Sequence, residues 1–486
     1  MVGLHRLPCE TPSAHSAEVS AKPTRWVLPA TILGSSLSLI DGSVVNVALP
    51  AIQRDLQTQL ATMQWVVNGY MLMLASLILL GGSAGDRFGR RRIFQIGLVG
   101  FALASLLCAL APSAGWLIVA RLVQGIAAAL LVPASLAILG SVYSGDARGR
   151  AIGTWAGAAA LTTALGPPLG GWLVDAIGWR AIVNVPVAVL AWLLTLKIPA
   201  DHRSETGQTL DWRGAGLAVL TLGLIGYGLI ALGQGQTFFG IVALTAAVPA
   251  AWFLIRTEAY TRAPMMPLWL FRNPAFAGTN GLTVLLYAAL SGALFLLPFL
   301  LIETRGYSAT AAGAAFLPFS AIMGAGSRSA GGLVRRFGPR APLISGPLIT
   351  ACGYTLLGLS PAGGSYWSDI LPGLVTVGVG MTITVAPLTT TVFDSAPKEK
   401  SGIASGINNA AARAGALVAV AALGLAFGGT GTSSIEPAAL PSAYRCVMFT
   451  AAGLAILSAL TAAATIRPDT SDKEDCNGLQ PPARAG

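Results

Sequence analysis

The stretch from Gly82 to Arg92, GSAGDRFGRRR, lies between an apolar run that ends near Leu80 and another that begins at Ile93. Its eleven residues contain one aspartate, four arginines and three glycines, although only 10% of the whole chain is charged. Glycine permits tight turns, and basic residues collect in the loops at one face of a membrane. The stretch therefore predicts a short, positively charged turn between two membrane-spanning helices.

The composition indicates that lipid, rather than water, surrounds most of the chain. Of 486 residues, 54% are hydrophobic and 10% are charged, whereas a soluble globular protein carries about a quarter charged residues. The formal net charge is +10, but the basic residues are concentrated in short segments between apolar runs. Because no basic helix face with interleaved aromatic residues is present, nucleic-acid binding is not expected.

Residue types that carry enzymatic or metal chemistry are scarce. The five cysteines show no CxxC or paired spacing, which argues against a metal site and gives no case for a disulfide. The sequence contains no Gly-x-x-x-x-Gly-Lys-Ser/Thr phosphate loop, and its three histidines lie outside the apolar runs. We expect neither an enzyme nor a cofactor, and ATP-driven transport has no support.

Apolar runs of about 20 residues, long enough to span a bilayer as helices, recur along the chain. We expect fourteen membrane helices, the first of them uncleaved and preceded by a polar tail of 25 residues. The expected spans are residues 26–48, 62–82, 93–111, 114–140, 151–174, 179–198, 213–232, 238–256, 275–302, 310–330, 341–359, 367–389, 401–426 and 444–466.

The distribution of lysine and arginine predicts the orientation of the helices. The tails and the loops after even-numbered spans hold 23 of the 30 basic residues, and the loops after odd-numbered spans hold four. Cytoplasmic loops carry the basic excess, so both termini are expected in the cytoplasm. The three remaining basic residues, Arg121, Arg328 and Arg413, lie within spans.

The two halves of the chain repeat each other. Gly89 corresponds to Gly338, and Gly153 to Gly402, at a common shift of 249 residues. This indicates a parallel repeat of six helices, as in transporters built from two bundles. The expected all-α organisation is a cytoplasmic tail at 1–25, a six-helix bundle at 26–198, a linker with inserted helices seven and eight at 199–274, a second six-helix bundle at 275–466 and a cytoplasmic tail at 467–486.

Four motifs resemble those of the major facilitator superfamily. The opening stretch fits Gly-x-x-x-Asp-Arg-x-Gly-Arg-Arg, and LIDGSVVNVALP, which ends at Pro50, resembles LDxTxVNVALP of the first helix. RLVQG, which begins at Arg121, matches Arg-x-x-Gln-Gly, and GPPLGG at 166–171 is similar to the antiporter motif. With six, two and six spans, the chain resembles the fourteen-span drug:proton antiporters of the QacA/EmrB type.

Asp41 in the first span and Arg121 in the fourth are the expected proton-coupling pair. Ionisable residues inside a membrane are costly and often bind or relay protons. At a rise of 1.5 Å per residue, both lie roughly 10 Å below the outer surface, so they are level with each other. We expect Arg121 to hold Asp41 deprotonated in one state. An acid satisfied by hydroxyl groups and a purely structural ion pair are the alternatives.

The resemblance implies a gate at each face. The outer, antiporter-motif seam is expected to contain Gly166, Pro167, Gly170 and Gly171. Thr162 and Pro168 depart from the family pattern there, and a generic packing face or an importer with this motif remains an alternative. The inner gate is expected to contain Gly82, Asp86, Arg87, Gly89 and Arg90. Its aspartate would meet the positive end of a helix from the other bundle.

Arg413, near the middle of the thirteenth span, resembles another arginine of the family. It either balances Asp41 across the bundle interface or pairs with backbone carbonyl groups. Aromatic and polar side chains on cavity-facing spans are candidates for substrate contact, since aromatic faces suit flat or cationic molecules. These candidates are Asn46, Trp65, Asn68, Tyr70, Trp155, Tyr287 and Asn408, and ordinary packing is the alternative for each.

The sequence thus predicts an exporter of small organic compounds, aromatic or cationic, in the cytoplasmic membrane, with protons as the exchanged ion. Two bundles would rock around a central site. A facilitator or proton symporter for a nutrient or a dedicated metabolite is the first alternative. A non-transporting membrane sensor is the second.

Overall fold

The computed structural model of the chain is built from helices. It describes residues 26–143, 145–182, 185–196, 198, 210–261, 263–330, 332–361, 363–397, 400–428 and 439–466. Within these ranges no strand occurs. The all-helical expectation is therefore confirmed for the described residues, and the two expected tails lie outside them.

The first six helices form a group that we call the first bundle. In a membrane each helix satisfies its own backbone hydrogen bonds, so long apolar runs fold in this way. The bundle consists of α1 (Val27–Asp55), α2 (Leu60–Phe88), α3 (Arg90–Ala109), α4 (Ala114–Val142), α5 (Gly145–Ala176) and α6 (Val185–Thr195), with a short turn of helix, η1 (Trp179–Ala181), before α6.

The remaining helices are a pair and a second group, which we call the second bundle. The pair is α7 (Trp212–Gly233) and α8 (Thr237–Tyr260), followed by η2 (Leu268–Arg272). The second bundle consists of α9 (Pro274–Phe299), η3 (Leu300–Thr304), α10 (Ala309–Ala314), α11 (Leu317–Ala330), α12 (Leu333–Phe337), α13 (Arg340–Leu359), η4 (Tyr366–Ile370), α14 (Leu371–Asp394), α15 (Ser401–Ala422), η6 (Leu423–Phe427) and α16 (Leu440–Thr465).

Twelve helical segments of the described residues are long and apolar enough to cross a membrane, where fourteen spans were expected. The chain is therefore a multi-pass membrane protein. The two expected spans outside this set are occupied by α5 and α6. The tenth expected span also differs, because a break at Ala315 and Phe316 separates α10 from α11.

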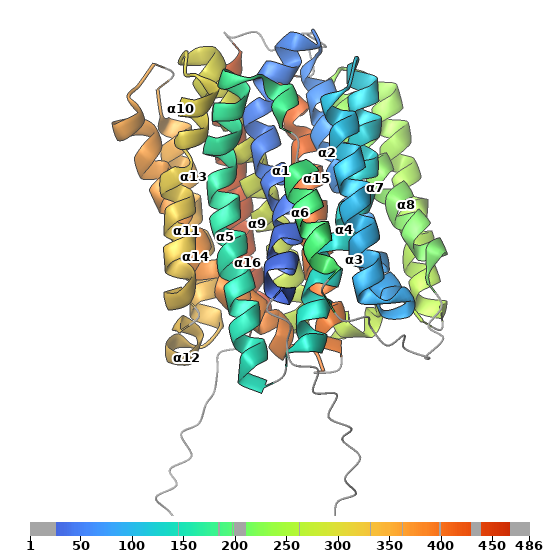
Figure 1. Ribbon diagram of the computed structural model, residues 1–486. Helices are drawn as coiled ribbons and strands as arrows, with labels where there is room; N and C mark the ends of the chain where they lie inside the picture. The colour runs from blue at the N-terminus through green and yellow to red at the C-terminus, as the bar shows by residue number, and fades with distance from the viewer. Residues whose placement is uncertain are drawn as a thin grey trace, which may run out of the picture.

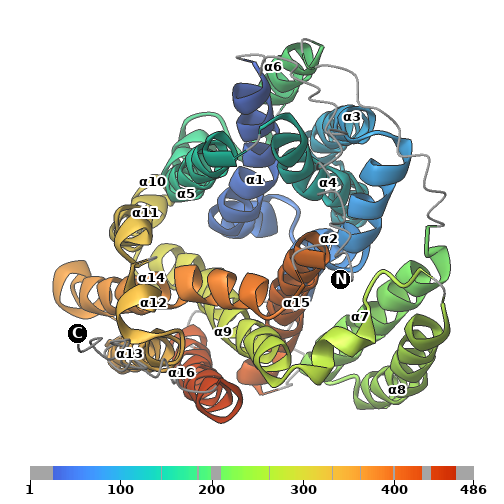
Figure 2. The ribbon, with the colours of Figure 1, turned by 90° about the horizontal axis from the view of Figure 1, so that it is seen from below.

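The two bundles stand side by side around a central axis (Figures 1 and 2). They meet along two seams, where α2 packs against α15 and where α5 packs against α10 and α11. The pair α7 and α8 lies at the edge of the molecule in Figure 2, and α7 packs against α2 and α15. Opposite ends of the helices define two faces, which we call the Gly89 face and the Asp175 face after a residue in each.

The turn between α2 and α3 is shorter than expected. The helix α2 continues to Phe88, and α3 begins at Arg90, so Gly89 alone separates them. Gly89 has φ of 100°, a conformation that residues with a side chain rarely adopt. Most of the opening stretch is therefore helical rather than loop, which holds its charged side chains on rigid backbone.

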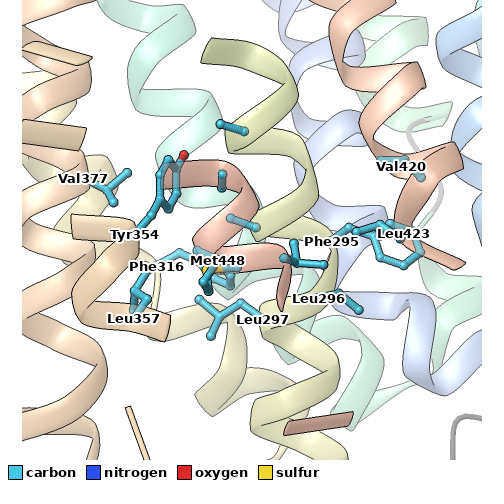
Figure 3. Packing of buried hydrophobic residues seen from close by; sticks show 14 of the residues in the cluster. Phe295, Leu296, Leu297, Phe316, Tyr354, Leu357, Val377, Val420, Leu423 and Met448 are labelled. Carbon is cyan, nitrogen blue, oxygen red and sulfur yellow. The ribbon is translucent and has the colours of Figure 1, made fainter. Parts of the chain in front are cut away.

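The second bundle is held together by close packing of apolar side chains (Figure 3). Leu297 of α9, Tyr354 and Leu357 of α13, Val377 of α14 and Met448 of α16 belong to one buried cluster. Lipid is as apolar as leucine, so van der Waals contact rather than exclusion of water stabilises such a cluster. The close packing stabilises the second bundle, which borders the space between the two bundles.

Candidate functional site

The bundles are joined by hydrogen bonds at the Asp175 face. Asp175, near the end of α5, accepts hydrogen bonds from the backbone N–H groups of Ala309 and Thr310 at 3.1 and 2.7 Å. The hydroxyl of Thr310 donates to the same carboxylate at 2.6 Å. These N–H groups begin α10, so a side chain of one bundle caps a helix of the other.

Glycines of α5 and α10 allow the two helices to touch at this seam. A Cβ atom at Gly171 would collide with the carbonyl oxygen of Ala309, and a Cβ at Gly313 would collide with that of Pro167. Such contact leaves no room for solvent between the helices. The seam lies where the antiporter motif was expected to form a tight packing surface.

The other two glycines of the motif face α1 instead. Cβ atoms at Gly166 and Gly170 would collide with Ser43 and Val44, respectively. The motif therefore packs α5 against its own bundle and the opposite bundle at once. Gly166 and Gly170 permit the contact with α1, and Gly171 permits the contact with α10.

Two further links join the bundles toward the Asp175 face. The Gln64 side chain on α2 donates to the carbonyl oxygens of Val420 and Ala421 at 2.7 and 3.2 Å. Arg54 and Glu303 form an ion pair at 3.7 Å with both side chains partly exposed. The hydrogen bonds from the Gln64 side chain to these two carbonyl oxygens are buried, and they join α2 to α15 at the second seam.

Asp86 at the opposite face does not contact the second bundle through an ion pair. Its carboxylate pairs with Arg90 of α3 at 2.9 Å, and Arg90 donates to the carbonyl oxygen of Ala137 at 3.1 Å. Both partners belong to the first bundle. The expected contact between Asp86 and a helix end of the other bundle is therefore not formed here. Of the remaining expected gate residues, Arg87 lies over the ring of Phe88 and Gly82 faces Pro133.

A cavity of about 430 Å³ lies between the two bundles. Its lining reaches Phe393, next to the last residue of α14, and Ser405, near the start of α15. Toward the Asp175 face the lining stops at Val47 on α1 and Val420 on α15. The cavity thus extends toward the Gly89 face and is closed off from the Asp175 face by the two seams.

The cavity is mainly apolar and aromatic, with a few polar groups. Three of the seven substrate candidates line it: Asn46, Tyr287 and Asn408. The Asn408 amide donates to Thr283 at 2.7 Å, which fixes its orientation. Arg413 is the only charged residue among the described residues that line the cavity.

Asp41 and Arg121 form an ion pair inside the first bundle, at 2.5 Å between Oδ2 and Nη1. Gln124 donates to the other carboxylate oxygen at 2.9 Å and accepts from Arg121 at 2.6 Å. The Nε of Arg121 donates to the carbonyl oxygen of Val66 at 3.1 Å. Asp41 and Arg121 are each 3% exposed, so their charges are stabilised by these partners rather than by water.

The pair does not line the central cavity. It borders a second, much smaller cavity of about 30 Å³, together with Gln124, Ser105 and Cys108. On α1 the residues on the central cavity, such as Ser38 and Gly42, lie on a different side of the helix from Asp41. The expected contact between Asp41 and Arg121 is present, but away from the space open to a substrate.

Tyr70 connects the pair to the cavity wall. Its ring lies under the guanidinium of Arg121, 4.5 Å from ring centroid to Cζ. Its hydroxyl is 2.6 Å from the hydroxyl of Ser38, which lines the cavity. Tyr70 is itself fully buried and does not line the cavity in this structure, so its contact with substrate stays a prediction.

Three other substrate candidates also lie away from the cavity. Trp65 packs beside Ile230 and Ala421, near α7, and the Trp155 indole donates to Ser35 at 3.0 Å. Asn68 is 1% exposed, and its amide has no hydrogen-bond partner among the described residues. The sequence locates these residues along their helices, but the rotation of each helix turns them to other neighbours.

Arg413 is not paired with Asp41. Both carboxylate oxygens of Asp41 are already bonded, to Arg121 and Gln124. Within the described part of the chain Arg413 has no hydrogen-bond or ion-pair partner, backbone carbonyl groups included. Neither expected role is therefore observed. The side chain of Arg328 lies outside the described residues.

Four residues of the site were not singled out from the sequence. Gln124 stands within the quoted RLVQG motif, one helical turn after Arg121, so its contact with the pair was accessible from the spacing. Ser38, Gln64 and Asp175 carry no signal of their own. Their partners come from distant parts of the chain, and only the packing of the bundles brings them together.

Comparison with known proteins agrees with this architecture. Residues 31–420 match the Major Facilitator Superfamily. The chain is 34% identical over 421 residues to the tetracenomycin C resistance and export protein of Streptomyces glaucescens, covering 85% of this chain and 78% of the relative. It is 35% identical over 410 residues to the methylenomycin A resistance protein of Bacillus subtilis (strain 168), covering 82% and 86%.

A solved transporter has the same fold. The crystal structure of a bacterial homolog to the human lysosomal transporter Spinster, in its inward-facing and unoccupied conformation, superposes with a TM-score of 0.65 at 19% identity. The match covers 90% of this chain and 96% of that one. Two bundles around a cavity, the matched family and this shared fold describe a transport protein rather than an enzyme, and the chain belongs to the Major Facilitator Superfamily.

Proposed function

We propose that this chain exports organic compounds in exchange for protons by alternating access. The observation that carries the proposal is the buried Asp41–Arg121 pair, set beside a cavity that lies between two bundles and is closed at one face. A buried carboxylate that is paired with a cation can take up a proton only if the cation can move away from the carboxylate. The printed names of the two relatives, one an export protein and both resistance proteins, support export of organic compounds.

We further propose that the Gly89 face is cytoplasmic, in the cytoplasmic membrane, with both tails inside. The basic residues concentrated at that face support this orientation. The cavity then opens to the cytoplasm, and this conformation loads substrate. The fourteen-span arrangement also belongs to the proposal: α5 and α6 cross the membrane, and α7 and α8 are inserted between two repeated six-helix domains of the QacA/EmrB type.

The proton site and the substrate site are separate in this mechanism. Both oxygens of Asp41 accept hydrogen bonds, from Arg121 and Gln124, so the proposed cycle starts from the carboxylate form of Asp41. Protonation of Asp41 weakens its attraction for Arg121 and leaves that buried cation without its ionic partner. The first bundle must then rearrange, which favours opening of the seam at the Asp175 face.

Tyr70 gives the two sites a direct physical connection. A molecule that contacts Ser38 in the cavity disturbs the hydroxyl contact to Tyr70, and the Tyr70 ring supports the guanidinium of Arg121. A ligand shifts a conformational equilibrium only through contacts that differ between the states. Ser38 and Tyr70 supply such a contact without requiring substrate to touch Asp41.

The small cavity beside the pair offers a route for the proton. Its volume of about 30 Å³ accommodates a water molecule, and Asp41, Gln124, Ser105 and Cys108 supply polar atoms around it. Trp179, which borders the same cavity, lies at the Asp175 face and donates to Asp55 at 3.0 Å. We propose that protons reach Asp41 from the outside by this path.

Transport into everted membrane vesicles tests the function. A fluorescent organic probe should accumulate only when a proton gradient is imposed, and Asp41→Asn should abolish this accumulation. Asp394→Asn is the matched control, since Asp394 is an exposed carboxylate at the end of α14 and outside the cavity lining. Gradient-driven accumulation that survives Asp41→Asn would remove Asp41 from the mechanism. Accumulation by right-side-out cells would favour the importer.

A further inference from the structure

We propose that the central cavity selects organic anions with a flat, apolar body, and that Arg413 is their counter-charge. This inference rests on the proposed transport function and names the substrate class of the same cavity. It differs from the cationic substrates that aromatic residues alone suggested. The geometry that carries it is the guanidinium of Arg413, which is unpaired among the described residues and lies in a lining whose other described residues are uncharged.

The described lining of the cavity carries a positive charge and no negative charge. Arg413 is the only charged residue among the described residues of the lining, which contain no aspartate or glutamate. Asp41, which was expected to balance Arg413, is outside the lining and has both oxygens bonded within the first bundle. The cavity therefore holds a net positive charge that a ligand can balance.

An unpaired cation inside the membrane part of a protein raises the free energy of the folded state. Removing a charged group from water without giving it a partner is strongly unfavourable, and buried charges are normally paired. Arg413 is half-buried and has no hydrogen-bond or ion-pair partner among the described residues. A guanidinium presents five N–H donors in a planar fork that fits a carboxylate or similar anion.

The rest of the wall fits the body of such a molecule. Tyr287, Phe316, Phe319 and Phe393 contribute aromatic side chains, and the volume of about 430 Å³ is within the range of small-molecule sites. The amides of Asn408 and Asn409 lie on the same helix as Arg413 and add polar groups near the charge. A cationic molecule of the same shape would meet a like charge with no acid to offset it.

Binding of two dyes to the purified protein tests this selectivity. Fluorescein and tetramethylrhodamine ethyl ester share a xanthene ring system but carry negative and positive charge, respectively, at neutral pH. The wild-type protein should bind fluorescein more tightly than the rhodamine ester. Arg413→Gln should weaken fluorescein binding roughly 10- to 100-fold, the range expected for a hydrogen-bonded charge. Arg413→Lys should retain a larger part of the affinity.

Two further variants separate charge from folding. Asn409→Asp keeps Arg413 but places a carboxylate one helical turn before it, so it should weaken fluorescein and strengthen the rhodamine ester. Arg256→Gln makes the same substitution on the exposed side of α8, outside the lining, and should change neither affinity.

Three results would overturn the proposal: no binding of fluorescein to the wild-type protein, equal or tighter binding of the rhodamine ester, or affinities within twofold of wild type for both Arg413→Gln and Asn409→Asp. Binding needs no proton gradient. Charge-selective binding in a protein that fails the vesicle test would refute proton-coupled export alone. Proton-coupled export with no dependence on ligand charge would refute the role of Arg413 alone.

Discussion

Two arginines of the membrane helices, Arg121 in the first bundle and Arg413 in the second, have opposite surroundings. Arg121 is 3% exposed and has the carboxylate of Asp41, the amide of Gln124, a backbone carbonyl and an aromatic ring as partners. Arg413 faces the central cavity with no hydrogen-bond or ion-pair partner among the described residues. The protein itself supplies all the partners of Arg121, whereas in our proposal a bound ligand supplies the partner of Arg413.

In the proposed proton antiport, the two environments have separate tasks. A satisfied, buried pair is suited to a proton, which is small enough to reach it through a narrow path. An unsatisfied cation on an open wall is suited to a larger molecule. In the proposed mechanism, protonation and substrate binding are coupled because both shift the arrangement of the helices. The proton and the substrate do not compete for one site.

The largest expected effect is on stability and distinguishes the two arginines directly. Arg121→Gln leaves Asp41 as a buried charge without its ionic partner, so the free energy of unfolding should fall by about 3 to 5 kcal/mol. Arg413→Gln removes no existing bond and should change the free energy of unfolding by about 0.5 kcal/mol or less. Denaturant unfolding of both variants in the same detergent measures the difference.

The double variant Asp41→Asn with Arg121→Gln is the control for that experiment. It removes both charges and should recover much of the lost stability, since two neutral amides need no ionic partner. Equal losses for Arg121→Gln and Arg413→Gln would contradict the contrast between the two environments.

The second effect concerns the seam at the Asp175 face. Gly171→Ala forces a Cβ against the carbonyl oxygen of Ala309, whereas Gly153→Ala in the same helix meets open space. Overpacking costs about 1 to 3 kcal/mol, so Gly171→Ala should shift the equilibrium about 5- to 150-fold toward the form open at this face.

Labelling of a cysteine introduced at Thr310 with a membrane-impermeant reagent reports this opening. In the closed form Thr310 is held by Asp175, so labelling should be slow in the Gly153→Ala background and fast in the Gly171→Ala background. The same labelling rate in both backgrounds would show that the glycine contact does not keep the seam closed.

A smaller effect is expected at the link between the two sites. Tyr70→Phe removes the hydroxyl contact to Ser38 but keeps the ring under Arg121, a loss of about 1 kcal/mol and about fivefold in coupled transport. Tyr354→Phe is the matched control, because Tyr354 lies in the apolar cluster of Figure 3 and its buried hydroxyl has no hydrogen-bond partner among the described residues. Vesicle transport rates of the two variants should differ in this direction, and equal rates would remove Tyr70 from the coupling path.

The smallest effect is expected at the ion pair between Arg54 and Glu303. Their side chains are 65% and 31% exposed, and exposed pairs contribute about 0 to 1 kcal/mol. Arg54→Gln should therefore lower transport by less than about fivefold. A near-complete loss of transport would mean that this pair, rather than the Asp175 seam, closes the Asp175 face.

The sequence predicted the helices well because each long apolar run must form one in lipid. It also predicted the meeting of Asp41 and Arg121, since depth along two helices follows from counting residues. It did not predict which side of a helix faces the cavity. Tyr70, Trp65 and Trp155 stand on the expected helices but point to protein neighbours, and that rotation depends on packing against distant segments.

The stretch around Gly89 shows a second limit of prediction from the sequence. The charge cluster was visible in the sequence, but its extension into α2 as helix and the pairing of Asp86 with Arg90 were not. A contact between Asp86 and the second bundle requires the bundles to meet at that face. In this conformation the cavity extends toward that face, so the partner of Asp86 depends on the state of the transporter as well as on its sequence.

Proton release on binding of a substrate tests the separation of the two sites most directly. Calorimetric titration of fluorescein in two buffers of different ionisation enthalpy, at mildly acidic pH, reports the protons released by each protein. Because coupling is reciprocal, the wild-type protein should release more protons on binding than Asp41→Asn, and Asp41→Asn, which cannot ionise, should still bind the dye but about 5- to 150-fold more weakly. Equal proton release by the two proteins, or loss of dye binding in Asp41→Asn, would contradict an account in which Asp41 carries the proton and the cavity of Arg413 carries the substrate.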